Sequence, residues 1–303
     1  MPELPEVEIV RRGLAAHVLG QKIRAVEVRH PRAVRRQVQG SGYFEAVLTG
    51  RTLTGTGRRG KFLWLVTDEP DLMLAAHLGM SGQFRVDALG SGGPAVDIGG
   101  EGADRGGELH RHARAHFDLG ERQLWFLDQR TFGWVTACPV VADPRGVPVP
   151  DLVRGIAPDP TDPAFDLRAV ARAMRTHRVE VKRLLLAQTL VSGIGNIYAD
   201  EALWAAGVHP RRRADRLSVA TLVGVLEAAS AVMVASLAEG GTSFDSLYVN
   251  VNGESGYYSR GLAVYGRAGL PCSRCGTLIV REHFMNRSSH VCPACQPPPR
   301  LPH

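Results

Sequence analysis

The sequence predicts an α+β protein of two domains, because strand-like and helix-like patterns occupy separate parts of the chain. Its 303 residues are enough for two domains, and the hydrophobic content of 44% is that of a chain with a core. Short apolar or alternating runs fill residues 21–138, whereas helical periodicity marks residues 166–241. Two Cys-x2-Cys pairs follow in the last tenth of the chain. We therefore expect a β-rich N-terminal domain, a helical C-terminal domain and a cysteine module.

The first predicted element is a helix over residues 6–19, which Gly20 ends. Its buried face is expected to contain Val7, Val10, Leu14 and His17. The start, "MPELPEVE", has two interpretations. Proline and glutamates suit a first helical turn. Alternatively, loss of Met1 frees the secondary amine of Pro2, and an α-amine with a pKa of about 7.7–8.0 is partly uncharged and nucleophilic near neutral pH.

Strands are expected at "KIRAVEV", "KFLWLV", "LMLAAHL" and "QLWFL", each of which turn residues bound. The glycine-rich stretch from Leu89 to Gly107 predicts a long loop, and the proline-rich stretch from Pro144 to Phe165 predicts an interdomain linker. The expected helices cover Asp166–Arg175, Arg178–Leu190, Asn196–Ala206 and a longer segment that Ser218 caps and Gly240-Gly241 ends.

Charge favours a polyanionic partner. The pI is near 9.3 and the formal charge is +6, with basic clusters at Arg29–Arg36 and Phe165–Arg216. Such clusters attract nucleic acid, although scattered solvated arginines would give the same totals. No apolar run approaches the ~20 residues of a membrane helix. The acidic N-terminus lacks a signal-peptide pattern, so we expect a cytoplasmic protein.

The strongest motif is a pair of Cys-x2-Cys knuckles with sixteen residues between them. The four thiolates are those of Cys272, Cys275, Cys292 and Cys295. This spacing fits one tetrahedral Zn²⁺, and four sulfur ligands leave no position for water, so the metal is expected to be structural. Disulfides are the alternative, which a cytoplasmic setting disfavours. Cys138 stands alone and is expected to be a buried filler.

Several basic and glycine-rich segments suggest phosphate contacts. Arg287 lies between the knuckles, where it is either a surface residue or a cation held against phosphate. In "VSGIGNIYADE", a glycine turn opens a helix at Asn196, and such turns bind anions. Arg178 and Lys182, on the preceding helix, are expected to grip a nucleic-acid backbone. The alternating residues of "HRHARAH" are expected to share one face of a strand.

Two expected loops carry bulky side chains. They are "HLGMSG", which contains Met80, and "DQRTFG", which contains Arg130 and Phe132. An exposed Met and Phe can act as wedges between bases. A place in the hydrophobic core is the alternative for both, and these two motifs alone favour it slightly.

Taken together and in this order, the motifs resemble those of bacterial formamidopyrimidine-DNA glycosylases. The resemblance rests on "MPELPEVE", "GKFLWL", "HLGMSG", "DQRTFG", "GIGNIYADEALW", "GGTSF…GYYSRGLAVYGR" and the four-cysteine finger. It implies an N-terminal β-sandwich flanked by helices and a helix-two-turn-helix bundle with a zinc-finger β-hairpin. The implied divisions are a catalytic domain (1–143), a linker (144–165), a helix-two-turn-helix domain (166–241), a lesion-capping loop (242–262), a zinc finger (263–296) and a disordered tail (297–303).

The resemblance also implies an activity, that of a bifunctional glycosylase and abasic-site lyase acting on 8-oxoguanine and formamidopyrimidines. Pro2 would attack C1′ and form a Schiff base, and Glu3 would act as acid and base on the sugar. The strand lysine Lys61 would assist elimination, and Arg287 would donate a proton in the last step. Cleavage would follow by β,δ-elimination.

The remaining implied residues contact DNA. They are His77, Met80, His110, Arg130, Phe132, Arg178, Asn196 and Tyr265, and the segment from Thr242 to Tyr258 would close over the extruded lesion. Met80, Arg130 and Phe132 would fill the gap left by the flipped nucleotide, with Arg130 reading the opposite cytosine. The implied partners are damaged double-stranded DNA and one structural Zn²⁺, with no membrane and no small-molecule cofactor. A monomer in the bacterial cytoplasm, associated with the nucleoid, is expected.

Two other functions stay open on the sequence. The related endonuclease VIII branch, which acts on oxidised pyrimidines, usually has Gly where this chain has Leu4. A non-catalytic damaged-DNA-binding module is the second, and the presence of Pro2, Glu3 and Lys61 argues against it. The glycine-rich segment is longer than the family usually has, and an extra residue nearby makes His112 an alternative to His110.

Overall fold

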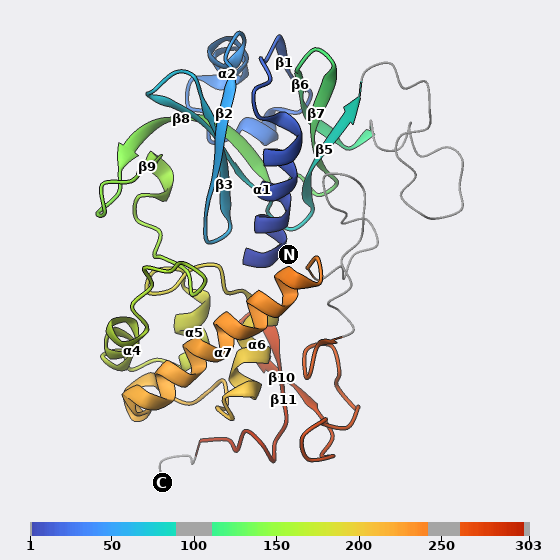
Figure 1. Ribbon diagram of the computed structural model, residues 1–303. Coiled ribbons are helices and arrows are strands. Elements are labelled where there is room, and N and C mark those ends of the chain that lie inside the picture. The colour runs from blue at the N-terminus through green and yellow to red at the C-terminus, as the bar shows by residue number, and fades with distance from the viewer. Residues whose placement is uncertain (1, 89–110, 242–260, 300–303) are drawn as a thin grey trace. The chain divides into compact units, whose positions relative to one another are not determined.

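A computed structural model describes residues 2–88, 111–241 and 261–299 of the chain (Figure 1). The chain divides into two compact units, of which the first contains residues up to Gly155 and the second contains Ile156–Glu239 and the cysteine module. The division falls inside the stretch predicted as a linker. That stretch is partly regular, however, because β9 (Pro148–Pro150) and η2 (Asp151–Val153) lie within it.

The first unit is a β-sandwich flanked by helices, as the sequence predicts. Its four-stranded sheet contains, in order, β1 (Ala25–Val28), β6 (Ala113–Asp118), β7 (Arg122–Asp128) and β5 (Gly82–Ala88). Its five-stranded sheet contains β2 (Leu53–Arg59), β3 (Phe62–Thr67), β4 (Leu72–His77), β8 (Trp134–Ala142) and β9. Neighbouring strands are antiparallel throughout.

One apolar core joins both sheets and two helices, α1 (Leu4–Val18) and α2 (Gly40–Leu48). Phe84 packs on Phe126 with ring centroids 5.2 Å apart, and Phe44 of α2 meets Phe117 edge-on at 6.1 Å. Helix α2 and η1 (Pro31–Val34) lie where only β-structure was predicted. Only Phe44 and Leu48 of α2 are buried, so its apolar stripe is too short to reveal the helical period.

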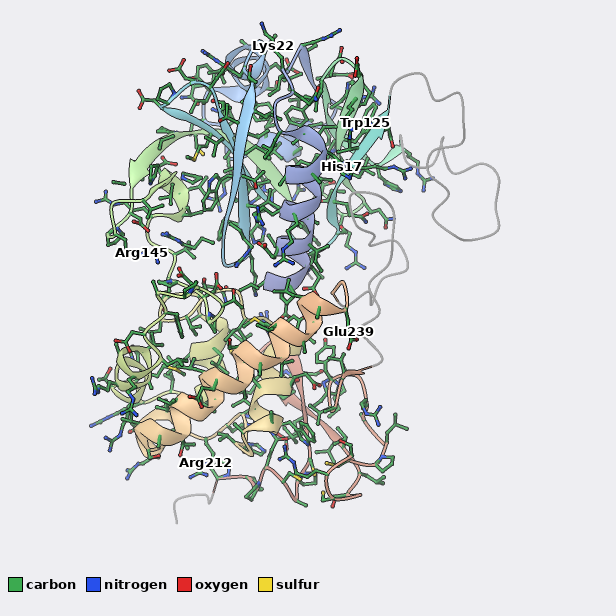
Figure 2. All side chains as sticks on the ribbon, viewed as in Figure 1. His17, Lys22, Trp125, Arg145, Arg212 and Glu239 are labelled. Carbon is green, nitrogen blue, oxygen red and sulfur yellow. The ribbon has the colours of Figure 1, made fainter. Side chains whose placement is uncertain are left out.

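Helix α1 begins two residues earlier than predicted. Its buried face contains Val18 rather than His17, which is half-buried near the end of the helix (Figure 2). The Nδ1 atom of His17 hydrogen-bonds Nη1 of Arg122 at 3.0 Å. This contact ties the end of α1 to the start of β7.

The second unit contains helices and a β-hairpin. Its elements are α4 (Leu167–Arg175), α5 (Val181–Leu186), α6 (Asn196–Ala205), η3 (Ala214–Arg216), α7 (Val219–Ala238), β10 (Val280–Phe284) and β11 (Arg287–Val291). The predicted cap is confirmed for α7, where Ser218 Oγ accepts a hydrogen bond from the Thr221 N–H at 3.0 Å. Helix α5 is shorter than predicted and stops before Gln188, whose φ of +63° is incompatible with a continuing helix.

Helix α7 corrects the expectation about apolar runs. Among the described residues, this one helix is long and apolar enough to cross a membrane by length and composition. Leu222, Leu226 and Met233 on it are fully buried, and α7 packs against α4 and α6 (Figure 1). About a third of its apolar window is buried, so its buried face forms part of the core of the second unit.

Candidate active site and nucleic-acid interface

The N-terminus of α1 brings an acidic residue next to Pro2. Glu3 is the N-cap, and its N–H donates to Oε2 of Glu6 at 2.9 Å in a capping box. Pro2 is buried, and Glu3 is only 2% exposed. The helix-start interpretation is thus correct for Glu6. The same box binds the Glu3 side chain to the backbone N–H of Glu6, so this buried carboxylate is held next to Pro2 as a candidate proton carrier.

Lys61 lies in a tight turn rather than on a strand, which corrects the prediction. Arg59 pairs with Phe62, so Gly60 and Lys61 form a two-residue hairpin between β2 and β3. Gly60 has a φ of +56°, which primed hairpin turns require at this position. Lys61 is 8% exposed, so the turn holds a buried amine at a defined place.

Two arginines that the sequence analysis missed anchor this turn. Arg58 donates from Nη1 to the Gly60 carbonyl at 3.1 Å and from Nε to Oε2 of Glu8 at 3.1 Å. Glu8 lies on α1, so one side chain connects the Lys61 hairpin to the helix that follows Pro2. Arg59 is buried and pairs with Asp143 at 2.5 Å. The adjacent arginines before "GK" were the available signal.

Glu8 accepts hydrogen bonds from three arginines. Arg11 and Arg12 donate to it at 2.8 and 2.9 Å, in addition to Arg58. Burial acts to raise the pKa of Glu8, but the hydrogen bonds from Arg11 and Arg12 and the nearby charges outweigh it and lower the pKa to about 2. The carboxylate is therefore charged at neutral pH.

His77 ends β4 and is uncharged at neutral pH. Burial, together with the charges of Lys61, Arg35 and Arg36, lowers its pKa to about 4. Its Nδ1 accepts the Gly79 N–H at 3.0 Å, which places the ring proton on Nε2. The ring also stacks on Trp134, with centroids 5.9 Å apart. His77 can therefore offer a phosphate a neutral N–H donor.

Met80, Arg130 and Phe132 are surface residues, so the core interpretation of Met80 and Phe132 is wrong. Met80 is 44% exposed, Phe132 is 46% exposed, and Arg130 is also exposed. Their loops are in direct contact, because a Cβ on Gly79 would lie 2.5 Å from the Phe132 carbonyl carbon. The structure thus brings the three side chains to neighbouring loops of the first unit.

In the second unit, Lys182 cannot grip nucleic acid, which corrects a second prediction. It is fully buried, and its Nζ donates to Oδ1 of Asp200 at 2.6 Å and to Oγ of Ser289 at 2.7 Å. Arg178, in contrast, is exposed just before α5. The two cations therefore have different roles, since Lys182 anchors strand β11 and Arg178 is accessible to a ligand.

The zinc-hairpin arginine is exposed next to this anchor. Arg287 begins β11 and is exposed. The backbone carbonyl of the next residue, Ser288, accepts a hydrogen bond from Nδ2 of Asn196 at 2.9 Å. Asn196 is the first residue of α6. Gln188, which the sequence analysis overlooked, closes the loop before it by accepting the Gly193 N–H at 2.9 Å and donating to the Ile194 carbonyl at 2.8 Å. Asn196 and Arg287 thus share one locally braced site.

Tyr265 is held from two sides. Its N–H donates to Oε1 of Glu201 at 2.8 Å, and its ring meets His290 at 4.8 Å. Glu201 also accepts the N–H groups of Ala263 and Val264 at 2.8 and 2.9 Å. Burial is the larger influence on Glu201 and raises its pKa, while these three donors oppose that shift. The sequence analysis did not recognise Glu201, in the motif "YADE", as a buried carboxyl group.

The four module cysteines fit one zinc ion. All are free thiols whose sulfurs lie within 4.8 Å of one another, in the part of the chain that the structure describes. The recorded separations of 3.4 to 3.9 Å agree with the ~3.8 Å edge of a tetrahedron with Zn–S bonds of about 2.3 Å. Trp204 of α6 donates to Cys272 Sγ at 3.4 Å. Cys138, by contrast, is buried in the first unit, where burial raises its pKa to about 12.

Some predicted features fall outside the described residues. These are His110, the segment from Leu89 to Gly107 and the segment from Thr242 to Tyr258. In the histidine segment, Arg114 and His116 alternate with the buried Ala113 and Ala115 on β6, which confirms the shared face for these two residues, whereas His112 lies in the turn before the strand. His116 stacks on Trp125 at 3.9 Å there.

Fold and site together define a DNA glycosylase that is built from an N-terminal β-sandwich and a helical unit with a four-cysteine zinc site. Family models agree. The formamidopyrimidine-DNA glycosylase N-terminal domain matches residues 1–135, its H2TH domain matches residues 156–247, and the zinc finger found in FPG and IleRS matches residues 269–298. The chain therefore belongs to the formamidopyrimidine-DNA glycosylase family.

Known relatives extend over the whole chain. The chain is 53% identical over 303 residues to the formamidopyrimidine-DNA glycosylase of Acidothermus cellulolyticus, with 100% of each covered. It is 54% identical to that of Mycobacterium avium, over 99% of this chain and 100% of the relative. The fold matches Lactococcus lactis Fpg complexed with abasic-site DNA, with a TM-score of 0.79, 32% identity, and 97% of this chain and 99% of that chain covered.

Zinc removal should unfold the zinc hairpin of the second unit and leave the first unit folded. We expect chelation, or Cys292→Ser, to remove one zinc ion and hydrogen-exchange protection from β10 and β11, because the metal replaces a core in so small a hairpin. Strands β2 to β8 should keep their protection, and DNA affinity should be lost. Cys138→Ala is the control and should retain one zinc ion. Simultaneous loss of protection in both units would contradict this division.

The Glu8 cluster should stabilise the fold in a pH-dependent way. Because its folded-state pKa of about 2 lies below the ordinary 4.5, its contribution is complete above pH 4.5 and is lost as the pH falls toward 2. We expect Glu8→Gln to lower the free energy of unfolding by about 2–3 kcal/mol at pH 7. Urea titrations should show this deficit shrinking below pH 4.5.

Glu27→Gln is the matched control, because Glu27 pairs with Arg29 in an exposed ion pair. It should cost less than about 1 kcal/mol at any pH. A Glu8→Gln deficit that stays constant from pH 7 to pH 3 would show that packing, rather than charge, is responsible.

Proposed function

We propose that this chain is a bifunctional DNA glycosylase and abasic-site lyase that removes oxidised purines from duplex DNA. The observation that carries the proposal is the placement of a buried carboxylate, Glu3, directly after Pro2, with α1 linked by Glu8 and Arg58 to the turn that holds Lys61. A module that only binds damage needs neither a buried lysine nor a buried acid there. This placement favours an enzyme.

The proposed reaction starts after Met1 is removed. The secondary amine of Pro2 attacks C1′ of the damaged nucleotide, the C1′–N bond breaks, and the base leaves with a proton. Glu3 supplies and accepts protons at the sugar, since its adjacency to Pro2 keeps it within reach. The product is an iminium ion joining Pro2 to the opened sugar.

The iminium makes the C2′ proton acidic, so the 3′ phosphate can leave by β-elimination and the 5′ phosphate by δ-elimination. Lys61, held in its turn, assists the first elimination and binds phosphate. Arg287 binds the phosphates flanking the lesion and provides a proton for the last step. The four-cysteine site supplies no reaction step, because four thiolates complete the coordination of a structural Zn²⁺.

Access to C1′ requires the nucleotide to leave the stack, which costs a few kcal/mol. The exposed Met80 and Phe132 fill the resulting gap, and Arg130 reads the opposite base. His77, Arg178, Asn196 and Tyr265 grip the backbone without reading sequence. His110 and the segment from Thr242 to Tyr258 complete the proposed DNA contacts and lesion-capping loop. The protein acts as a monomer in the cytoplasm, and nucleoid association follows from its substrate.

8-Oxoguanine and formamidopyrimidines are the proposed lesions. The names of the relatives and a Lactococcus lactis complex with Fapy-dG DNA, at a TM-score of 0.80 and 31% identity, support this choice. Another complex of that enzyme contains an oxidised pyrimidine, so pyrimidine lesions are the second candidate. A panel that places each lesion opposite C, A, G and T distinguishes the two.

Borohydride trapping tests the covalent step. We expect protein that begins at Pro2 to form a stable adduct with 8-oxoguanine duplex, because borohydride reduces the iminium to an amine. Peptide mass spectrometry should place the adduct on Pro2. Pro2→Gly or a retained Met1 should lower the yield about 10-fold or more, because either puts a primary amine, less rigid or displaced by one residue, where the ring nitrogen of Pro2 belongs.

Val38→Ala serves as the control, because Val38 is 96% exposed and lies outside the proposed machinery. Its trapping yield should equal that of the wild type. Strand cleavage by the native protein with no trapped adduct would refute the covalent mechanism.

A further inference from the structure

Arg35 is a surface arginine whose guanidinium binds the protein's own backbone. It follows η1 in the first unit and is exposed along its side chain. Its Nη2 donates to the Phe132 carbonyl at 2.6 Å, and its Nη1 donates to the Gly133 carbonyl at 2.7 Å. The same Nη1 donates to the Arg32 carbonyl of η1 at 2.8 Å, and the Thr131 carbonyl lies 3.5 Å from it. One side chain therefore ties the end of η1 to the carbonyls of Phe132 and Gly133 in the loop between β7 and β8.

The opposite side of this loop is held by a buried carboxylate. Asp128 is 1% exposed, and its oxygens accept the Arg130 N–H at 3.0 Å and the Gly133 N–H at 2.6 Å. Ser81, from the Met80 loop, donates its hydroxyl to the same carboxylate at 2.6 Å. Asp128 satisfies N–H groups and Arg35 satisfies carbonyls, so the loop backbone is bound on both sides.

The loop needs this support because its backbone is strained. Thr131 has a φ of +55°, which a β-branched residue rarely adopts. It lies between Arg130 and Phe132, so the turn at Thr131 decides where both exposed side chains point. The Met80 loop depends on the same backbone, since Gly79 packs against the Phe132 carbonyl with no room for a Cβ.

We propose that Arg35 is a positioning residue for opposite-base discrimination, because it fixes the loop that carries Arg130 and Phe132. The proposal rests on the proposed function, in which Arg130 reads the base opposite the lesion. Arg35 contacts neither the lesion nor the opposite base and acts through the Thr131–Gly133 carbonyls. Without it, Arg130 and Phe132 remain present but lose their fixed direction.

The test measures single-turnover excision of 8-oxoguanine placed opposite C, A, G and T. We expect Arg35→Met to lower the rate opposite C by about 10- to 100-fold and the other rates less, because a misplaced reading group loses mainly its specific contact. The preference for C over A should fall accordingly. Arg35→Lys keeps the charge but not the forked donors, so it should restore only a small part of the preference.

Arg32→Met is the matched control, because Arg32 is an exposed arginine on η1 and its removal causes the same loss of charge. It should keep the wild-type preference. Unchanged preference in Arg35→Met would overturn the proposal. If thermal unfolding shows that Arg35→Met is not folded, Arg35→Lys serves for the same comparison. An unchanged preference for C in Arg35→Lys would then overturn the proposal.

Two further measurements exclude other roles. If Arg35 contacted a phosphate, Arg35→Met would lower the affinity for undamaged duplex and reduce the slope of log affinity against log salt concentration by about 1. We expect neither change, and finding both with equal loss opposite all four bases would overturn the positioning role. Borohydride trapping on an abasic site in single-stranded DNA should equal that of the wild type, and its loss would also overturn it. If the wild type itself forms no adduct, the proposed function fails, whatever Arg35 does.

Discussion

A buried carboxylate must be matched by donors, and this requirement organises both units. The half-buried Glu8 is matched by arginines, the buried Asp128 by backbone N–H groups and a hydroxyl, and the buried Asp200 by a lysine. Each joins segments distant in sequence, because at least one of its donors comes from another element. Removing any one donor would leave part of a charge unsatisfied in a poorly solvated place. The positions of the proposed functional side chains therefore depend on acids that are not among the proposed DNA contacts.

Because some cations pair with these acids, cations of the same residue type differ in exposure. Arg58 and Lys182 are committed to carboxylates, whereas Arg178 and Arg287 remain exposed. Anchoring cations fix backbone geometry, and exposed cations are available to phosphates. Net charge alone could not distinguish the two groups, because both count equally toward the total of +6.

The sequence predicted features that depend on local chemistry. The zinc knuckles, the Ser218 cap and the start of α6 at Asn196 follow from spacing and turn residues. Features that depend on tertiary partners were missed or misread. Lys182 resembled a surface cation until Asp200 and Ser289 surrounded it, and α2 lacked a visible period because only two of its side chains are buried. Exposure of Met80 and Phe132 likewise depends on how two loops meet, which no single motif encodes.

Trp204 gives the zinc module a tryptophan of its own. The indole N–H donates to the sulfur of Cys272, and the Arg274 guanidinium lies 4.2 Å above the ring. Metal binding or oxidation changes the charge on that sulfur, so either event alters the electrostatic surroundings of the indole. One of the chain's four tryptophans thus lies where an optical signal of cluster filling would originate.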